Sequence, residues 1–179
     1  EHGVISFSNQ LAKDCGVKKG MSVKEAALLL LTIDTANMSS AETTNRTIMQ
    51  TSSDGRHVVA TDSIAFATEE DSERNVLVTA GHTGRSAVPY LLKSKPWGFI
   101  CSDGGRGMDD SGIAGLIIVE EFGLAGATVD AKLARMGSGL SHYHDGVISA
   151  VNSHAQTRGV EVGMSASEAS SILLQKAQL

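Results

Sequence analysis

The residues best suited to chemistry stand in three glycine-rich segments, each of which follows an apolar run. These segments are residues 81–86, 102–110 and 130–144, and each contains an arginine. Glycine allows backbone N–H groups to approach a ligand closely, and arginine can bind a carboxylate or a phosphate through two parallel hydrogen bonds. The three segments therefore predict a site for a small metabolite that carries an anionic group.

Two side chains in these segments are candidates for proton transfer. His82 lies between glycine and threonine, and Asp103 ends an apolar run just before two glycines, so we expect them to be catalytic. The candidate substrate-binding residues are Gly81, Thr83, Gly84, Arg85, Ser86, Gly104, Gly105, Arg106, Gly107, Asp109, Asp130, Lys132 and Arg135. Since no redox motif is present, the pattern favours a metabolic isomerase, lyase or hydrolase.

The three segments are also compatible with roles other than catalysis. Each segment could form a tight turn with exposed charges. The set could also belong to a non-catalytic anion-binding or regulatory module, or to a structural domain that forms oligomers. The sequence contains neither the dinucleotide fingerprint nor the Gly-Lys-Ser/Thr ending of a P-loop, so no cofactor is assigned.

Histidine and cysteine side chains elsewhere give weaker signals. His142 and His144 would face one metal ion if the chain were extended there, but no third or fourth ligand is evident and no metal is assigned. Cys15 and Cys101 stand among apolar neighbours, which is typical of buried, reduced thiols in a cytoplasmic protein. Cys101 is alternatively a nucleophile beside the second segment.

The elements around the three segments predict an α/β fold. Strands are expected at residues 76–80, 97–102 and 124–129, and helices at 86–93 and 111–122. The alternation of strand, loop and helix is typical of a parallel sheet, whose right-handed crossovers bring the loops to one edge.

Further local signals complete this prediction. Asp109 or Asp110 is suited to cap the helix at 111–122. Residues 47–50 and 57–66 predict a β-hairpin around Asp54-Gly55, and residues 130–145 a long polar loop. We expect three layers: a mainly parallel sheet with helices on both faces, an N-terminal β-hairpin region, and duplicated helical hairpins at both termini.

The two ends of the chain match each other without gaps at an offset of 143. Residues 3–31 and 146–174 share Gly-Val-Ile-Ser, Gly-Met-Ser and Glu-Ala at equivalent positions. Periodicity predicts helices at 2–15, 22–36, 146–158 and 166–177, with Ser22 and Glu25 forming a capping box. The expected division is residues 1–40 as a helical hairpin, repeating 144–179, and residues 41–179 as the α/β domain.

Two arrangements are compatible with this duplication. The hairpins could pack pseudo-symmetrically on one domain or across a subunit interface, which favours a homo-oligomer. Alternatively, the chain could be part of a tandem-repeat protein.

Composition excludes several classes of protein. The 179 residues carry a net charge of −5 with acids and bases mixed along the chain, and aromatic residues make up 4%. A nucleic-acid-binding protein would need a basic face and stacking aromatics. The longest apolar run, residues 26–31, is far shorter than a membrane span. We therefore expect no nucleic-acid partner, no membrane association and a cytoplasmic location.

Overall fold

The computed structural model of the chain describes residues 3–32 and 46–175. The chain divides into two compact units, Glu1–Glu42 and Thr43–Leu179. The three glycine-rich segments belong to the larger unit. None of the described helices is both long and apolar enough to cross a membrane.

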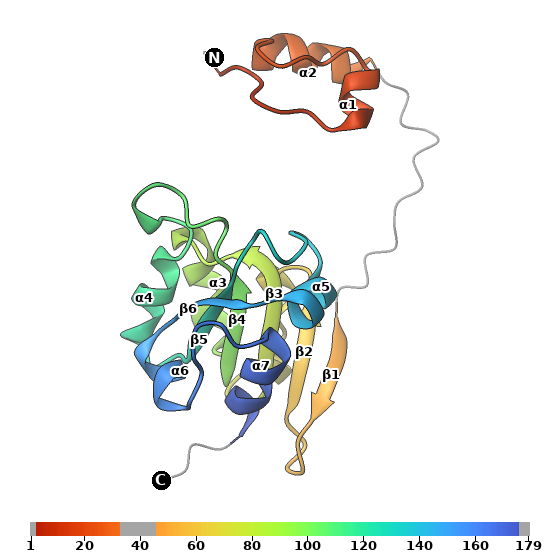
Figure 1. Cartoon of the computed structure of the whole chain (residues 1–179). Helices are drawn as coiled ribbons and strands as arrows, with labels where there is room; N and C mark the ends of the chain where they lie inside the picture. Colours follow the sequence, from red (N-terminus) through yellow and green to blue (C-terminus); the bar gives the residue numbers. More distant parts are fainter. Residues whose placement is uncertain (1–2, 33–45, 176–179) are drawn as a thin grey trace. The chain divides into compact units, whose positions relative to one another are not determined.

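The described part of the larger unit contains one six-stranded sheet with the strands in chain order (Figure 1). The strands are β1 (Thr47–Thr51), β2 (His57–Thr61), β3 (Val76–His82), β4 (Gly98–Ser102), β5 (Gly126–Val129) and β6 (Ile148–Val151). Strands β2 to β5 are parallel, while β1 and β6 pair antiparallel at the two edges. This mixed sheet, combined with helices, confirms the expected α/β class.

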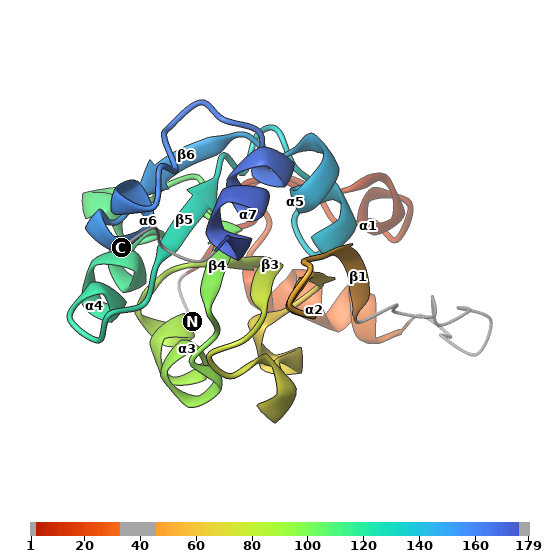
Figure 2. The same cartoon turned by 90° about the horizontal axis from the view of Figure 1, so that it is seen from below.

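Helices connect and cover these strands. They are α3 (Val88–Ser94), α4 (Ala114–Glu120), α5 (Gly139–Asp145), α6 (Ser153–Thr157) and α7 (Ala166–Leu174). Val58 and Ala60 of β2 pack in one buried cluster with residues of α5 and α7, whereas Val59 packs in another with residues of α3 and α4. Neighbouring strand residues point to opposite faces, and Figure 2 shows α7 and α3 on opposite sides of β3 and β4.

The register of the parallel strands brings their carboxyl ends together. His82 at the end of β3 pairs with Ser102 at the end of β4, and Ser102 pairs with Val129 at the end of β5. The segments that follow these strands therefore leave the sheet side by side, at the edge where open α/β sheets bind ligands.

Three boundaries in the larger unit differ from the expected ones. Strand β2 ends at Thr61 because Ser63 caps a 3₁₀ turn at Ile64–Phe66. Helix α4 begins at Ala114 without a side-chain cap, so the prediction that an aspartate caps a helix at residue 111 is wrong. The polar loop expected at 130–145 contains helix α5, which Ser138 caps.

The helices predicted at 2–15 and 146–158 are also wrong over their first halves. In the second stretch, residues 148–151 form β6, which pairs with β5, and only Ser153–Thr157 is helical. The apolar spacing suited a helix, but β-branched Val and Ile fit a strand equally well. Asn152 then caps α6 through its side-chain oxygen.

The smaller unit contains α1 (Gln10–Asp14) and α2 (Val23–Leu31). Asn9 caps α1, and the capping box predicted for Ser22 and Glu25 is confirmed at the start of α2. Residues 3–8 are not helical, and Val4 forms an isolated bridge with Ser22. Helices α2 and α7 end at Leu31 and Leu174, with Thr32 and Gln175 as their C-caps, so the predicted continuations to residues 36 and 177 are wrong. Residues 33–36 and 176–177 themselves lie outside the described part of the chain.

Candidate functional site

The three glycine-rich segments border one hollow at the carboxyl edge of the sheet. Its volume is about 480 Å³. The residues that line it are His82, Gly84, Arg85, Gly104, Gly107, Ser111, Gly112, Ala114 and Met136. Met136 comes from the third segment, so all three strand ends contribute to the wall.

His82 is exposed at the end of β3, and its ring is held in place by two glycines. The Gly84 N–H donates a hydrogen bond to Nδ1 of His82 over 3.0 Å. A Cβ at Gly84 would lie 2.8 Å from the same nitrogen, and one at Gly104 would lie 2.9 Å from the His82 Cβ. The glycines therefore let the first two segments close around the imidazole, and Nε2 is the nitrogen left for a ligand.

The second segment has an unusual backbone. Gly104, Gly105 and Gly107 have positive φ, and so do Arg106 (φ 63°) and Asp109 (φ 55°). The left-handed region costs a non-glycine residue about 1 kcal/mol or more, and such strain concentrates at functional sites. Three glycines thus lower the cost of a loop that curls back beside His82.

Two further glycines fix this loop to its neighbours. The Gly112 N–H donates to the Arg106 carbonyl over 2.7 Å, and a Cβ at Gly112 would overlap the Asp103 carbonyl oxygen. The Gly115 N–H donates to the Thr83 carbonyl over 2.7 Å, and a Cβ there would lie 2.6 Å from that oxygen. The start of α4 therefore rests directly on the first segment.

Asp103 connects the second and third segments. Its side chain is only 3% exposed, and its Oδ1 accepts hydrogen bonds from the N–H groups of Gly105 (2.8 Å) and Ala131 (3.0 Å). This carboxylate is held by backbone donors from two segments. The arrangement suits positioning of the loops better than proton transfer to a ligand.

The predicted cationic residues differ in whether they form an ion pair and whether they line the hollow. Arg106 donates through Nε to Asp110 over 2.7 Å, which raises the pKa of Arg106 and lowers that of Asp110. In the described part of the chain Arg85 has no ion-pair partner, and it lines the hollow. Lys132 and Arg135 are exposed but do not line it. Arg85 is therefore the cation available to an anionic ligand.

The hollow brings together only part of the predicted set. His82, Gly84, Arg85, Gly104 and Gly107 line it. The predicted residues outside its lining are Gly81, Thr83, Ser86, Asp103, Gly105, Arg106, Asp109, Asp130, Lys132 and Arg135. Thr83 is fully buried and donates its hydroxyl to the Ser102 carbonyl, while Asp130 accepts from the Lys132 N–H.

Four lining residues were not predicted: Ser111, Gly112, Ala114 and Met136. Gly112 could have been suspected, because a glycine so close to a helix start indicates close backbone contact. The other three carry no chemical signal in the sequence.

The structure does not support the two alternative sites, a metal site at His142 and His144 and a nucleophile at Cys101. Residues 142–144 are helical, with His142 fully buried and His144 exposed, so the prediction that they share one face is not met. No three or more metal-ligating side chains gather in the described part of the chain. Burial raises the pKa of the Cys101 thiol, which accepts a hydrogen bond from Thr79. A buried neutral thiol is not a nucleophile.

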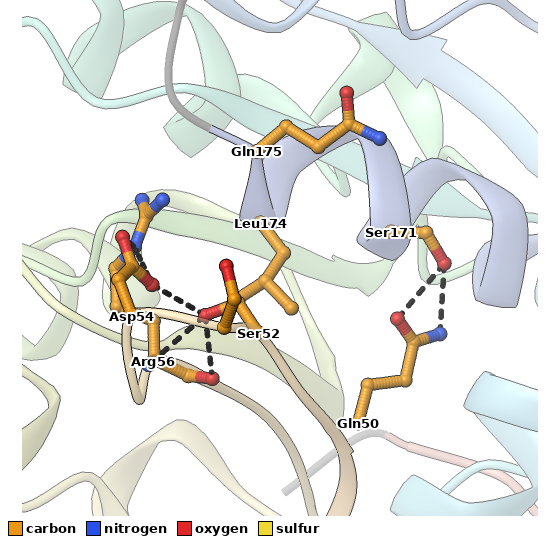
Figure 3. A pocket seen from close by; sticks show the side chains of 8 residues that line it. Gln50, Ser52, Asp54, Arg56, Ser171, Leu174 and Gln175 are labelled. Atoms are coloured by element: carbon orange, nitrogen blue, oxygen red, sulfur yellow. Dashed lines mark hydrogen bonds and ion pairs between the residues drawn. The ribbon is translucent and has the colours of Figure 1, made fainter.

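A larger hollow of about 550 Å³ lies at the other edge of the sheet, between the β1–β2 turn and α7 (Figure 3). The Nε of Arg56 lies 3.1 Å from the carboxylate of Asp54. The Arg56 guanidinium also stacks 4.6 Å from the ring centroid of Trp97, whose ring Arg158 approaches to 4.7 Å. Arg56 and Trp97 directly precede β2 and β4, at the amino ends of parallel strands, where α/β sheets rarely bind substrates.

Comparisons of the chain with models of protein families, with curated proteins and with solved structures found no match. The functional conclusion therefore depends on the geometry of the site.

Proposed function

We propose that the hollow of about 480 Å³ binds a small metabolite through a carboxylate or phosphate group, and that the protein is a metabolic enzyme that transfers a proton on this ligand. The observation that carries the proposal is that His82 and Arg85 line the same hollow, with Arg85 outside any ion pair in the described structure. Arg85 would bind the acid group, and Nε2 of His82 would face the reacting atoms.

The chemistry that this pair supports is general acid–base catalysis. One imidazole and one guanidinium suit an isomerase, a lyase or a hydrolase that works by proton transfer. Asp103 would hold the second and third segments in place, as its two backbone hydrogen bonds suggest. The lining residues Gly107 and Gly112 would let backbone groups come close to the ligand.

Calorimetric titration with inorganic phosphate and with a series of mono- and dicarboxylic acids tests the binding step. Replacing Arg85 with Ala should weaken the best ligand about 10- to 100-fold, because a hydrogen bond to a charged group contributes about 1.5–3 kcal/mol. Arg106→Ala is the matched control, since Arg106 is paired with Asp110. Equal losses in the two variants would contradict the assignment to Arg85.

The second candidate function is a non-catalytic anion-binding or regulatory module. The buried, braced state of Asp103 favours it, because it leaves His82 as the one proton-transfer group in the lining. Deuterium uptake from D₂O into the bound ligand distinguishes an enzyme from a non-catalytic module. His82→Gln should lower the exchange rate about 10²- to 10⁴-fold while affinity persists, and His57→Gln should change neither. Binding without exchange in the wild type would favour the module.

We also propose the finer features of the predicted fold, a three-layer arrangement and duplicated terminal hairpins. The two buried clusters that alternate along β2 support the layers. The equivalent caps at Asn9 and Asn152 support the duplication. A homo-oligomer and a cytoplasmic location remain proposals, and mass measurement in solution tests the first.

A further inference from the structure

Residues 3–31 and 146–174, which we call the N-terminal and C-terminal segments, have the same backbone connections at an offset of 143. In the N-terminal segment the Ile5 N–H donates to Met21 O and the Gly20 N–H to Ile5 O, both over 2.8 Å. In the C-terminal segment Ile148 donates to Met164 and Gly163 to Ile148 over 2.8 and 2.9 Å. Isolated bridges join Val4 to Ser22 and Val147 to Ser165.

The side chains that fill the interior of each segment are buried in both. Val17 and Ala26 are 3% and 2% exposed, and their equivalents Val160 and Ala169 are fully buried. Each segment therefore has its own small interior.

The side chains on the other face differ in burial. Ala166, Leu173 and Leu174 of the C-terminal segment are 0%, 0% and 5% exposed, because they pack in the cluster that covers the sheet. The equivalents in the N-terminal segment are Val23 (50% exposed), Leu30 (42%) and Leu31 (79%). The surface that attaches the C-terminal segment to the sheet is apolar in the N-terminal segment too, where the described part of the smaller unit does not cover it.

The hydrogen bonds of two equivalent asparagines, Asn152 and Asn9, differ between the segments in the same way as the burial does. Asn152 caps α6, accepts from the Gly126 N–H (3.0 Å) and donates to the Leu124 carbonyl (2.8 Å), which ties β6 to the start of β5. Asn9 caps α1 in the same way but is exposed, and in the described structure its side chain makes no second contact. Asn9 thus retains the group that its equivalent uses for docking.

We propose that the N-terminal segment is a docking element for a second α/β domain with the sheet topology of residues 47–145, in which the edge of the strand equivalent to β5 is free. Residues 5–8 would pair with that edge as β6 pairs with β5 here, and Val23, Leu30 and Leu31 would cover the sheet. An added strand gains backbone hydrogen bonds at an exposed edge and specificity from its side chains.

The partner differs from the body of this chain in two respects. Here the site holds the C-terminal segment, and Gln50 bonds Ser171 over 2.8 Å. The residue equivalent to Ser171 is Leu28, and the residue equivalent to the fully buried Ala166 is the larger Val23. The partner's sheet must therefore be apolar where Gln50 stands and roomier beside Val23.

A chimeric full chain, in which residues 3–31 also replace residues 146–174, tests this match. It should unfold cooperatively, and Gln50→Leu should raise its Tm by about 3–5 °C because Leu28 then meets an apolar side chain. In the wild type the same substitution should lower Tm, since Gln50 also bonds Tyr143 and Ser171. A chimera that Gln50→Leu destabilises as it does the wild type would overturn the match.

Because the chimera could fail to fold, a cross-link between two full chains provides a second measurement. One chain carries Phe7→Cys; the other carries Thr128→Cys, Gln50→Leu and Asn152→Ala, which loosens its own C-terminal segment. Thr128 pairs with Ala150, the equivalent of Phe7, so a mixed disulfide should form. Ser8→Cys is the control, because neighbouring residues of a strand point to opposite faces of the sheet. Its yield of mixed disulfide should be at least fivefold lower than that of Phe7→Cys. Equal yields, or no disulfide at either position, would overturn the proposal.

Discussion

The N–H of Gly84 donates to Nδ1 of His82 over 3.0 Å, so the imidazole is held by the segment that also carries Arg85. A nitrogen that accepts a hydrogen bond cannot carry the proton in the neutral ring. We expect neutral His82 to be the Nε2–H tautomer. Nitrogen chemical shifts from long-range ¹H–¹⁵N spectra measure this directly, and a protonated Nδ1 in the neutral form would contradict the geometry.

Gly112 is predicted to tolerate no side chain. A Cβ there would overlap the Asp103 carbonyl oxygen, so Gly112→Ala should cost about 2–4 kcal/mol of unfolding free energy. Gly105→Ala is the control, because φ is +73° there but no atom lies within 4 Å of the new Cβ, and it should cost about 1 kcal/mol. Chemical denaturation measures both, and a larger cost at Gly105 would show that strain outweighs the overlap.

His142 should make the fold sensitive to mild acid. Burial lowers the pKa of its imidazole, although the Ser138 carbonyl and the Asp103 charge act in the opposite sense. A folded pKa below the unfolded value of about 6.5 means that the unfolded chain binds the proton first, so stability falls as pH drops from about 6.5. The variant His142→Asn should not lose stability in this way. The difference in unfolding free energy between wild type and variant should therefore become smaller as pH falls. A gap that widens between pH 6.5 and 5 would contradict this.

Asp71 should act in the opposite sense. Burial alone would raise the pKa of this fully buried carboxyl, but hydrogen bonds from Arg46 (2.8 and 2.9 Å), Asn75 and Thr68 lower it. A lowered folded pKa stabilises the fold above the unfolded pKa of about 3.9, and that stability is lost as pH falls through the folded pKa.

Asp71→Asn should therefore destabilise the protein by about 3–5 kcal/mol at pH 7, because it leaves Arg46 unpaired. The difference from wild type should shrink below about pH 4. Denaturation curves across this range provide the measurement, and a difference that is independent of pH would show that packing, rather than charge, is lost.

The sequence predicted the parallel strands and the edge where their loops meet, because runs of Val, Ile, Leu and Ala bounded by glycine have few alternatives to a buried strand. The prediction was wrong where the apolar pattern was compatible with both a helix and a strand. Residues 148–151 show helical spacing but pair with β5, since a free sheet edge stabilises a strand more than one apolar stripe stabilises an isolated helix.

The site was predicted in part for a similar reason. Spacing places His82 and Arg85 next to a strand end, but the direction of each side chain depends on loop dihedrals that no periodicity fixes. Arg106 has a positive φ and pairs with Asp110, so a residue expected to bind a ligand is satisfied locally. Met136 enters the wall because of the path of the third segment, which the sequence does not indicate.

The stacking of Arg56 and Arg158 on Trp97 has a practical consequence for assays. Trp97 is the single tryptophan of the chain and stands where β4 begins, across the sheet from the His82 hollow. Its indole emission will respond when the strands separate, yet a molecule that enters beside His82 should leave the spectrum unchanged. An optical titration would then miss an occupant that calorimetry detects.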